Sequence, residues 1–217
     1  MSKAVLESRF SQDNYREIGV DEAGRGPLFG RVYTAAVILP SDDTFRHDLM
    51  KDSKKFTSKN KIQEAYHYIK ENAISWSVTY EDEKTIDKIN IRQATLKSMH
   101  HSIKNLNPCS NTRLLIDGND FKPYMLYSNK IYKQIPHHCI ESGDNKYSAI
   151  AAASILAKVA RDTYIEKLCE QHTYLIDQYQ INNNKGYGTK AHIEGLKKYG
   201  VTPWHRLSYG ICKNISN

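Results

Sequence analysis

Residues 18–30 read IGVDEAGRGPLFG, an apolar run that ends in the adjacent carboxylates Asp21 and Glu22 and enters the glycine-rich turn GRG at 24–26. The next residues, RVYTAAVIL (31–39), have the β-branched and apolar bias of a buried strand. The pattern predicts two consecutive strands joined through the turn. It also places the carboxylates at a strand end, where a rigid scaffold can point side chains into a cleft.

The rest of the chain mixes strand and helix patterns. Helices are expected over about residues 58–71, 90–106, 147–171 and 190–199, and further strands over 73–82 and 112–118. The Tyr- and Lys-rich segment 119–139 has no clear periodicity, beyond one strand leading to Ile140. Because strands come first as a meander and later alternate with helices, we expect an α/β fold with a mixed sheet rather than a fully parallel one.

Composition narrows the class of protein. A chain of 217 residues with 40% hydrophobic residues can bury one substantial core, so a single domain over 1–217 is expected. The charge of +7 favours an acidic partner, most often nucleic acid, although AT-rich coding also enriches Lys and Asn. The four cysteines form no CxxC pair that would indicate a zinc site. No signal peptide or membrane span is indicated, so a cytoplasmic protein is expected.

Two further carboxylates occupy positions like those of Asp21 and Glu22. Asp117 ends the strand at 112–118, and Asp144 precedes the long helix. If the four converge, their repulsion predicts one or two Mg²⁺ or Mn²⁺ ions held by oxygen ligands, as in in-line displacement at phosphorus. The alternative is that they are solvated turn formers. Spacing alone leaves Asp120 and Asp162 as competitors.

The glycines and the basic residues allow several interpretations. Gly24, Gly26 and Gly30 miss the dinucleotide fingerprint by one residue, and a strand instead of a helix follows them. Tyr187, between two glycines, could stack on a sugar or a base, or could be an ordinary packed tyrosine. The candidate phosphate contacts, any of which could instead be a solvated or ion-paired residue, are Lys54, Lys55, Lys158, Lys185, His205 and Arg206.

Six segments together resemble the type 2 ribonucleases H, in the order in which that family carries them. They are GVDEAGRGPLFG (19–30), DSKKFTSKNK (52–61), IDKINIRQATLKSM (86–99), LLIDGN (114–119), GDNKYSAIAAASILAKVARD (143–162) and NKGYGTKAHIEGLKKYGVTPWHRLSYG (184–210). The resemblance covers nearly the whole chain. The intact GRG, the tyrosine and the short length favour type HII over type HIII.

The resemblance implies an RNase H-like fold, with a five-stranded mixed sheet flanked by helices (core about 16–170) and a helical C-terminal extension (about 171–210). It implies metal-dependent hydrolysis of RNA in RNA/DNA hybrids and at ribonucleotides embedded in duplex DNA, leaving 5′-phosphate and 3′-hydroxyl ends. The residues that match the family's metal-binding carboxylates are Asp21, Glu22, Asp117 and Asp144. Those that match its ribose-reading turn and stacking tyrosine are Gly24, Arg25, Gly26 and Tyr187. Asp162 matches a different position and is expected to be structural.

The resemblance leaves two alternatives and shows two departures. A junction resolvase has no 2′-hydroxyl to read, and a non-catalytic hybrid-binding protein would not need all four carboxylates. Arg31 stands where the family usually has proline, and the loop between Asp117 and Asp144 is longer than in bacterial relatives. The C-terminus has no clamp-binding motif, so a monomer without an obligate protein partner is expected. The expected roles are ribonucleotide excision and RNA primer removal.

Overall fold

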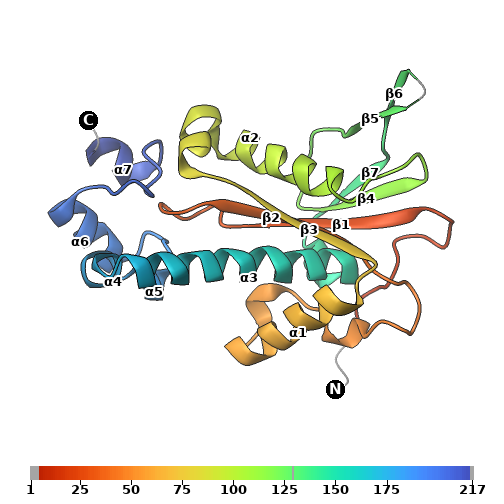
Figure 1. Cartoon of the computed structure of the whole chain (residues 1–217), viewed down its shortest axis with the longest axis horizontal. Helices are drawn as coiled ribbons and strands as arrows, with labels where there is room; N and C mark the ends of the chain where they lie inside the picture. The colour runs from red at the N-terminus through yellow and green to blue at the C-terminus, as the bar shows by residue number, and fades with distance from the viewer. Residues whose placement is uncertain (1–4, 129, 216–217) are drawn as a thin grey trace.

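A twisted five-stranded sheet forms the centre of the computed structural model, which describes residues 5–128 and 130–215 (Figure 1). The strands are β1 (Arg16–Ala23), β2 (Val32–Ile38), β3 (Ser75–Glu81), β4 (Thr112–Asp117) and β7 (His137–Ile140). Their order is β3-β2-β1-β4-β7; β2 is antiparallel to β1 and β3, whereas β4 runs parallel to β1 and β7. The prediction of a mixed five-stranded sheet flanked by helices is confirmed.

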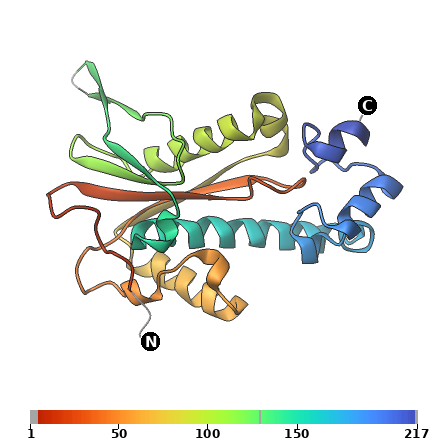
Figure 2. The ribbon, with the colours of Figure 1, turned by 180° about the vertical axis from the view of Figure 1, so that it is seen from behind.

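Helices cover both faces of this sheet. α2 (Glu83–Lys104) lies on one face, and α1 (Lys59–Asn72) and the long α3 (Ser148–Gln171) lie on the other, as the views from opposite sides show (Figure 2). Ile18 and Val20 point into the core under α2. Gly19, between them, faces α3 so closely that a Cβ atom there would lie 2.2 Å from the carbonyl carbon of Ala149. The first turn of α3 therefore packs directly on β1.

The second helix begins earlier than its sequence pattern predicts. α2 starts at Glu83, where the side chain of Asp82 caps it by accepting a hydrogen bond from the Thr85 N–H. Asn90, the predicted first residue, lies inside the helix with φ of 65°, and its side chain accepts from the Gln93 N–H. Asn90 thus caps the second part of a kinked helix, which is why its local signal resembled a helix start.

The unassigned segment between β4 and β7 contains a small hairpin. Its strands, β5 (Met125–Ser128) and β6 (Ile131–Gln134), pair only with each other and project beyond the main sheet (Figure 1). The rings of Tyr127 and Tyr132 face each other across the hairpin at 4.8 Å, and both are exposed. Because little of it is buried, the hairpin lacks the one-sided apolar pattern that identifies a strand.

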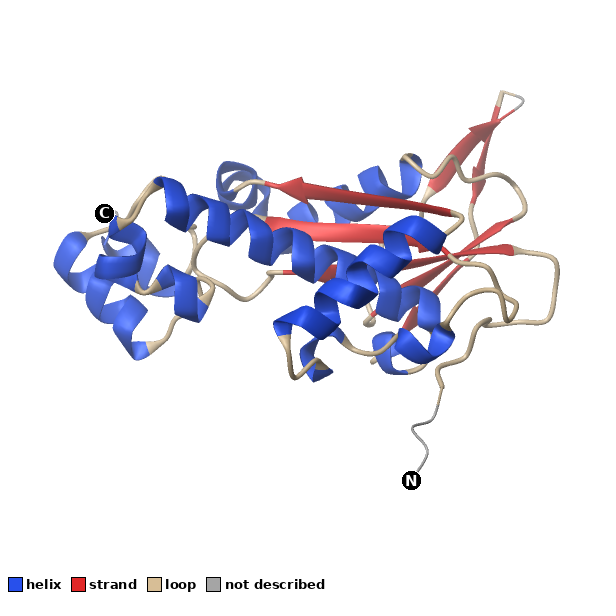
Figure 3. Cartoon of the chain, turned by 60° about the horizontal axis from the view of Figure 1, so that its bottom comes forward, coloured by secondary structure: helices blue, strands red, loops and turns tan. Residues whose placement is uncertain are grey.

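Short helices form the C-terminal extension at the end of the sheet where β1 stops (Figure 3). They are α4 (Tyr174–Tyr179), α5 (Ile181–Asn184), α6 (Lys190–Tyr199) and α7 (Gly210–Ile215), so the extension reaches a few residues further than expected. They share a buried cluster with Phe29 and with Ile165 of α3. The four cysteines all lie in the described part of the chain, and none of them forms a disulfide. Of the helices described, none combines the length and the apolar character needed to cross a membrane.

Candidate active site

Three of the four predicted carboxylates meet where β1, β4 and the start of α3 come together. Val20 of β1 pairs with Ile116 of β4 in parallel register, so Asp21 and Asp117 are the next residues on adjacent strands. Asp144 lies in the 3₁₀ turn η3 (Gly143–Asn145), just before α3. Asp21 and Asp144 are both buried. The sheet and one helix terminus thus bring together residues that are up to 123 positions apart in the chain.

Hydrogen bonds orient these carboxylates. Asp21 accepts from the Glu22 N–H at 2.6 Å, and Asp117 accepts from the Gly143 N–H at 2.8 Å. The amide of Asn145 donates to Asp144 at 2.9 Å. Each of these contacts uses one carboxylate oxygen, Oδ1, and none uses a cationic partner.

Burial and mutual repulsion raise the pKa of Asp21, Glu22 and Asp144. Burial raises the pKa of Asp21 well above its ordinary value, and the charges of Glu22 and Asp117 raise it further. Burial also raises the pKa of Asp144 to about 6, with Asp117 and Asp52 adding to the shift. The pKa of Glu22 is raised by burial, an effect that Arg25 opposes and Asp117 reinforces. The charge of Asp117 therefore acts on each of the other three carboxylates, and that of Glu22 also acts on Asp21, a repulsion that a bound cation would relieve.

The donor set suits a hard divalent cation, because all of its members are carboxylate oxygens. Across the two described ranges, however, no three acidic, histidine or cysteine side chains stand in the arrangement of a formed metal centre. The convergence of the carboxylates rests on the strand register and on their electrostatic coupling.

On the α2 side, Glu22, Arg25 and Asp117 line a cavity of about 190 Å³. Asp120 also lines it, but both of its oxygens are bound by Arg92 of α2, at 2.6 and 2.7 Å. The other competitor, Asp162, pairs with Lys158 on α3 at 2.7 Å. Neither contributes to the electrostatic coupling of the four carboxylates.

The turn at 24–26 is held from behind by the C-terminal extension. Gly24 has φ of +95°, a conformation that favours glycine. The fully buried guanidinium of Arg206 donates hydrogen bonds to four backbone carbonyls, those of Gly24, Arg25, Pro27 and Gly30, at 2.6 to 2.9 Å. The Tyr209 hydroxyl donates to the Arg25 carbonyl at 2.8 Å. Side-chain hydrogen bonds from the C-terminal extension therefore fix the backbone conformation of the turn.

Tyr187 stands beside this turn. Its side chain is 51% exposed, and a Cβ atom on Gly26 would lie 3.5 Å from its ring. The chain that carries it is tied to residue 28, because the Leu28 N–H donates to the Gly186 carbonyl at 2.9 Å. The structure thus places an open aromatic ring next to an open glycine backbone.

The basic residues divide into two groups. Lys54 and Lys55 are exposed on the 3₁₀ turn η2 (Ser53–Lys55), and the charge of Lys54 lowers the pKa of both Glu22 and Asp144. The prediction of a phosphate contact is wrong for Arg206 and His205, because both side chains are buried. Lys158 and Lys185 are ion-paired, with Asp162 and Glu166 respectively.

Three residues that the sequence analysis missed lie next to the site carboxylates and contact them or one another. Ser154 of α3 hydrogen-bonds to Asp21 and to Ser53, whose hydroxyl lies 3.0 Å away. Asp52 caps η2 and faces Asp144 and Asn145. The segment DSKK contained both Asp52 and Ser53, but nothing in its local pattern indicated that it docks on α3.

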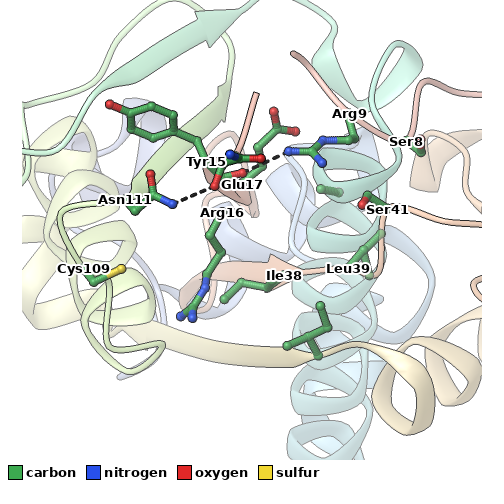
Figure 4. Close-up of a pocket in the computed structure, with 13 residues that line it drawn as sticks. Ser8, Arg9, Tyr15, Arg16, Glu17, Ile38, Leu39, Ser41, Cys109 and Asn111 are labelled. Carbon is green, nitrogen blue, oxygen red and sulfur yellow. Dashed lines mark hydrogen bonds between the residues drawn. The ribbon is translucent and has the colours of Figure 1, made fainter. Parts of the chain in front are cut away.

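A larger cavity, of about 420 Å³, lies at the opposite end of β1 (Figure 4). Arg16, Glu17 and Ile38 line it, together with residues of the N-terminal segment. Its polar groups bind backbone: Arg9 donates to the Tyr15 carbonyl and Asn111 to the Asn14 carbonyl. None of the four predicted carboxylates lines it.

Comparisons with known proteins identify relatives of this chain. Residues 18–212 match the family model "Ribonuclease HII". A ribonuclease HII of Porphyromonas gingivalis is 43% identical over 205 residues, which cover 94% of each chain. One from Bacteroides thetaiotaomicron is 43% identical over 195 residues, 90% of each chain.

Solved structures show the same fold at lower identity. The ribonuclease H2 of Pyrococcus horikoshii superposes with a TM-score of 0.69 at 23% identity, covering 92% of this chain and 96% of that one. The RNase HII of Archaeoglobus fulgidus, solved in complex with PCNA, also gives 0.69 at 23% identity, with 90% and 95% covered. Bst-RNase HIII, solved in complex with Mn²⁺, gives 0.64 at 19% identity, with 94% and 70% covered.

Proposed function

The chain belongs to the ribonuclease HII family and is a ribonuclease H; from this premise we propose that it hydrolyses the RNA strand of RNA/DNA hybrids and cuts duplex DNA 5′ of an embedded ribonucleotide. The products would carry 5′-phosphate and 3′-hydroxyl ends. The observation that supports this proposal is that Asp21 and Glu22 end β1 and that the turn at 24–26 follows them directly on the same segment.

Asp21, Glu22, Asp117 and Asp144 would hold one or two divalent cations, Mg²⁺ or Mn²⁺. Asp21, Asp117 and Asp144 each accept one protein hydrogen bond at Oδ1, and a cation would use the remaining lone pairs of these carboxylates. When bound, such cations lower the pKa of an attacking water and stabilise the charge on the leaving 3′-oxygen. Ser154 and Asn145 orient the carboxylates, and the exposed Lys54 offers a positive charge to a phosphate beside them.

The turn at 24–26 would recognise the ribose. Its 2′-hydroxyl is the group that distinguishes one ribonucleotide from the surrounding DNA. The carbonyls of Gly24 and Arg25 already accept hydrogen bonds from Arg206 and Tyr209, so we assign the contact with the 2′-oxygen to the N–H groups of the turn. Gly26 is exposed, and the absence of a side chain there allows the sugar to approach the backbone beside the Tyr187 ring.

Tyr187 would stack on the sugar next to the ribonucleotide. Its ring is half exposed and adjoins Gly26, so a sugar that touches the turn also meets the ring. Arg25, whose side chain is 49% exposed, and Lys55 would contact phosphates on either side. We propose that the protein acts in the cytoplasm, in ribonucleotide excision and primer removal, as a monomer without an obligate protein partner.

Cleavage of three duplexes tests this function: DNA with one ribonucleotide, a long RNA/DNA hybrid, and DNA alone. With Mg²⁺ or Mn²⁺ we expect a single cut 5′ of the ribonucleotide, cuts throughout the RNA strand, and none in DNA. A chelator should stop both reactions. Equal cutting of the DNA control would contradict the assignment, and cutting of a four-way DNA junction would favour a resolvase. Hybrid binding without cleavage at any metal concentration would indicate a non-catalytic hybrid-binding protein.

A further inference from the structure

Two buried histidines of the C-terminal extension face each other without any role in the proposed chemistry. His192, on α6, is fully buried, and His205, in the segment before α7, is 2% exposed. Their Nε2 atoms lie 3.0 Å apart, which is a hydrogen bond. Two imidazoles can bond in this way only if one ring donates and the other accepts.

Backbone groups at both ends fix the direction of this bond. The Thr202 N–H, which can only donate, points at Nδ1 of His205 at 2.9 Å, so that nitrogen carries no proton. The proton of a neutral His205 must then lie on Nε2, which donates to Nε2 of His192. His192 in turn carries its proton on Nδ1, 2.9 Å from the carbonyl oxygen of Tyr187, which can only accept. The result is a chain of three hydrogen bonds with one direction, which we call the relay. The Thr202 N–H donates to His205, His205 donates to His192, and His192 donates to the Tyr187 carbonyl.

Both rings are buried against aromatic side chains and not against charges. The Phe29 ring lies edge-on to His205 at 5.0 Å, and the Tyr179 ring lies 5.3 Å from it. Burial lowers the pKa of both histidines, in agreement with a neutral pair.

The relay also joins the two halves of the proposed ribose site. His205 reaches the Tyr187 carbonyl through His192, while the next residue, Arg206, binds the Gly24 carbonyl and three others of the same turn. The dipeptide His205-Arg206 is therefore the common support of the turn at 24–26 and of the chain that carries the stacking ring.

We propose that His192 and His205 are positioning residues that set the Tyr187 ring against the turn at 24–26, and so determine how well the enzyme selects a single ribonucleotide. The proposal rests on the proposed function, in which that ring stacks beside the ribose. Long hybrids offer many ribonucleotides and many alternative registers. Misplacing the ring should therefore reduce cleavage of a single embedded ribonucleotide more than cleavage of a hybrid.

The relay itself can be tested without any activity. Nitrogen-15 NMR of the wild-type histidine rings at pH 7 should show His192 neutral with the proton on Nδ1, and His205 neutral with the proton on Nε2. Tyr187→Ala, which retains the backbone carbonyl, should leave both tautomers unchanged. A charged ring, or a proton on Nε2 of His192, would overturn the proposal.

Kinetics then test the positioning role. His192→Leu removes one of two donors to the Tyr187 carbonyl, the other being the Thr189 N–H at 2.8 Å. We expect kcat/KM on the single-ribonucleotide duplex to fall about tenfold, the size expected for one lost buried contact, with less than about a threefold change on a long hybrid. His192→Asn keeps an N–H near the position of Nδ1 and should restore most of the loss. Tyr187→Ala removes the ring itself, so it gives the largest loss of kcat/KM that misplacing the ring could cause.

Two control variants separate positioning from general stability. Leu175→Ala removes buried volume from the same helical cluster and leaves the relay intact, so it should lower both activities by the same factor. His67→Leu, on the exposed face of α1, should change neither. If His192→Leu lowers kcat/KM equally on both substrates, or if His192→Asn does not restore selectivity, the histidines have no positioning role. A wild-type enzyme that does not cut at single ribonucleotides would instead contradict the proposed function.

Discussion

The guanidinium of Arg206 and the carbonyl oxygen of Gly24, 182 residues apart in the chain, are joined by a 2.6 Å hydrogen bond. Arg206 looked from the sequence like a residue that would touch a phosphate. In the structure it is fully buried, and it donates hydrogen bonds to four backbone carbonyls within residues 24–30. The C-terminal extension therefore supports the turn at 24–26 from inside the protein.

Arg206→Ala should destabilise the protein strongly. It leaves four carbonyls without their donor in a buried space, so we expect a loss of about 4 kcal/mol or more in the free energy of unfolding, measured by urea denaturation. Arg206→Lys, which keeps the charge but not the planar fork, should lose less. Arg46→Ala, an exposed arginine paired with an exposed Asp48, is the control and should change stability by less than about 0.5 kcal/mol. If Arg206→Ala lost as little stability as the control, Arg206 would not support the turn at 24–26.

Salt dependence should distinguish the exposed lysines from Arg206. Removing one phosphate contact reduces the slope of log affinity against log salt by about 0.9. We expect that change for Lys54→Ala and Lys55→Ala, measured by binding of a hybrid in the presence of Ca²⁺ or of a cleavage-dead variant. Arg206→Lys should leave the slope unchanged. A reduced slope for Arg206→Lys would show that this residue reaches the nucleic acid after all.

Gly24→Ala should disrupt the turn for two separate reasons. Its φ of +95° is unfavourable for alanine, and the new Cβ would lie 2.2 Å from Nε of the buried Arg161. We expect a loss of about 2 to 4 kcal/mol in stability, measured by thermal and chemical denaturation. Gly118→Ala isolates the first reason, because φ is +90° there but nothing lies within 4 Å, and should cost about 1 kcal/mol. Equal losses would exclude the steric contribution.

Asp21→Asn should abolish cleavage and keep the fold. The amide is isosteric, and it removes a buried charge that already repels Glu22 and Asp117, so stability should stay constant or rise. We expect a loss of kcat of about a thousandfold with both substrates, the upper end of the range for removing one group that stabilises charge in the transition state. Asp162→Asn is the matched control, since this carboxylate pairs with Lys158, and it should retain activity. Full activity of Asp21→Asn would remove Asp21 from the site.

The free energy of unfolding should fall in acid, because the buried His205 resists protonation in the folded protein. Burial and the neighbouring His192 lower the pKa of His205 to about 3, whereas an unfolded histidine titrates near 6.5. Between these values the unfolded state binds the proton and the folded state does not. The contribution is therefore complete above about pH 6.5 and is lost as the pH falls, by up to about 1.4 kcal/mol per pH unit. Phe29, Tyr179 and Thr202, which also face the ring, do not titrate in this range.

Unfolding of wild type and His205→Gln between pH 4 and 8 isolates this contribution from that of the carboxylates. The wild type should lose more stability than the variant on going below pH 6.5. Parallel curves would show that His205 does not remain neutral in the folded protein.

The buried elements were predictable, because burial leaves a run of apolar residues or a periodic pattern in the sequence. The apolar runs of β1, β2 and β4 and the Ala-rich α3 were found close to their observed bounds. The hairpin β5–β6 and the true start of α2 were not. The hairpin has little buried surface, and Asn90 carries the signal of a helix start inside a kinked helix.

The sequence by itself determined the chemistry: carboxylates at strand ends, a glycine turn on the same segment, and an aromatic residue between two glycines. These are local features, which depend on the identity and order of neighbouring residues. Only the tertiary structure decided what Arg206, His192 and His205 do. An arginine or histidine is equally polar at the surface and in the interior, so its role depends on which distant backbone groups its donors meet. Those partners lie up to 182 residues away, and folding alone brings them within hydrogen-bonding distance.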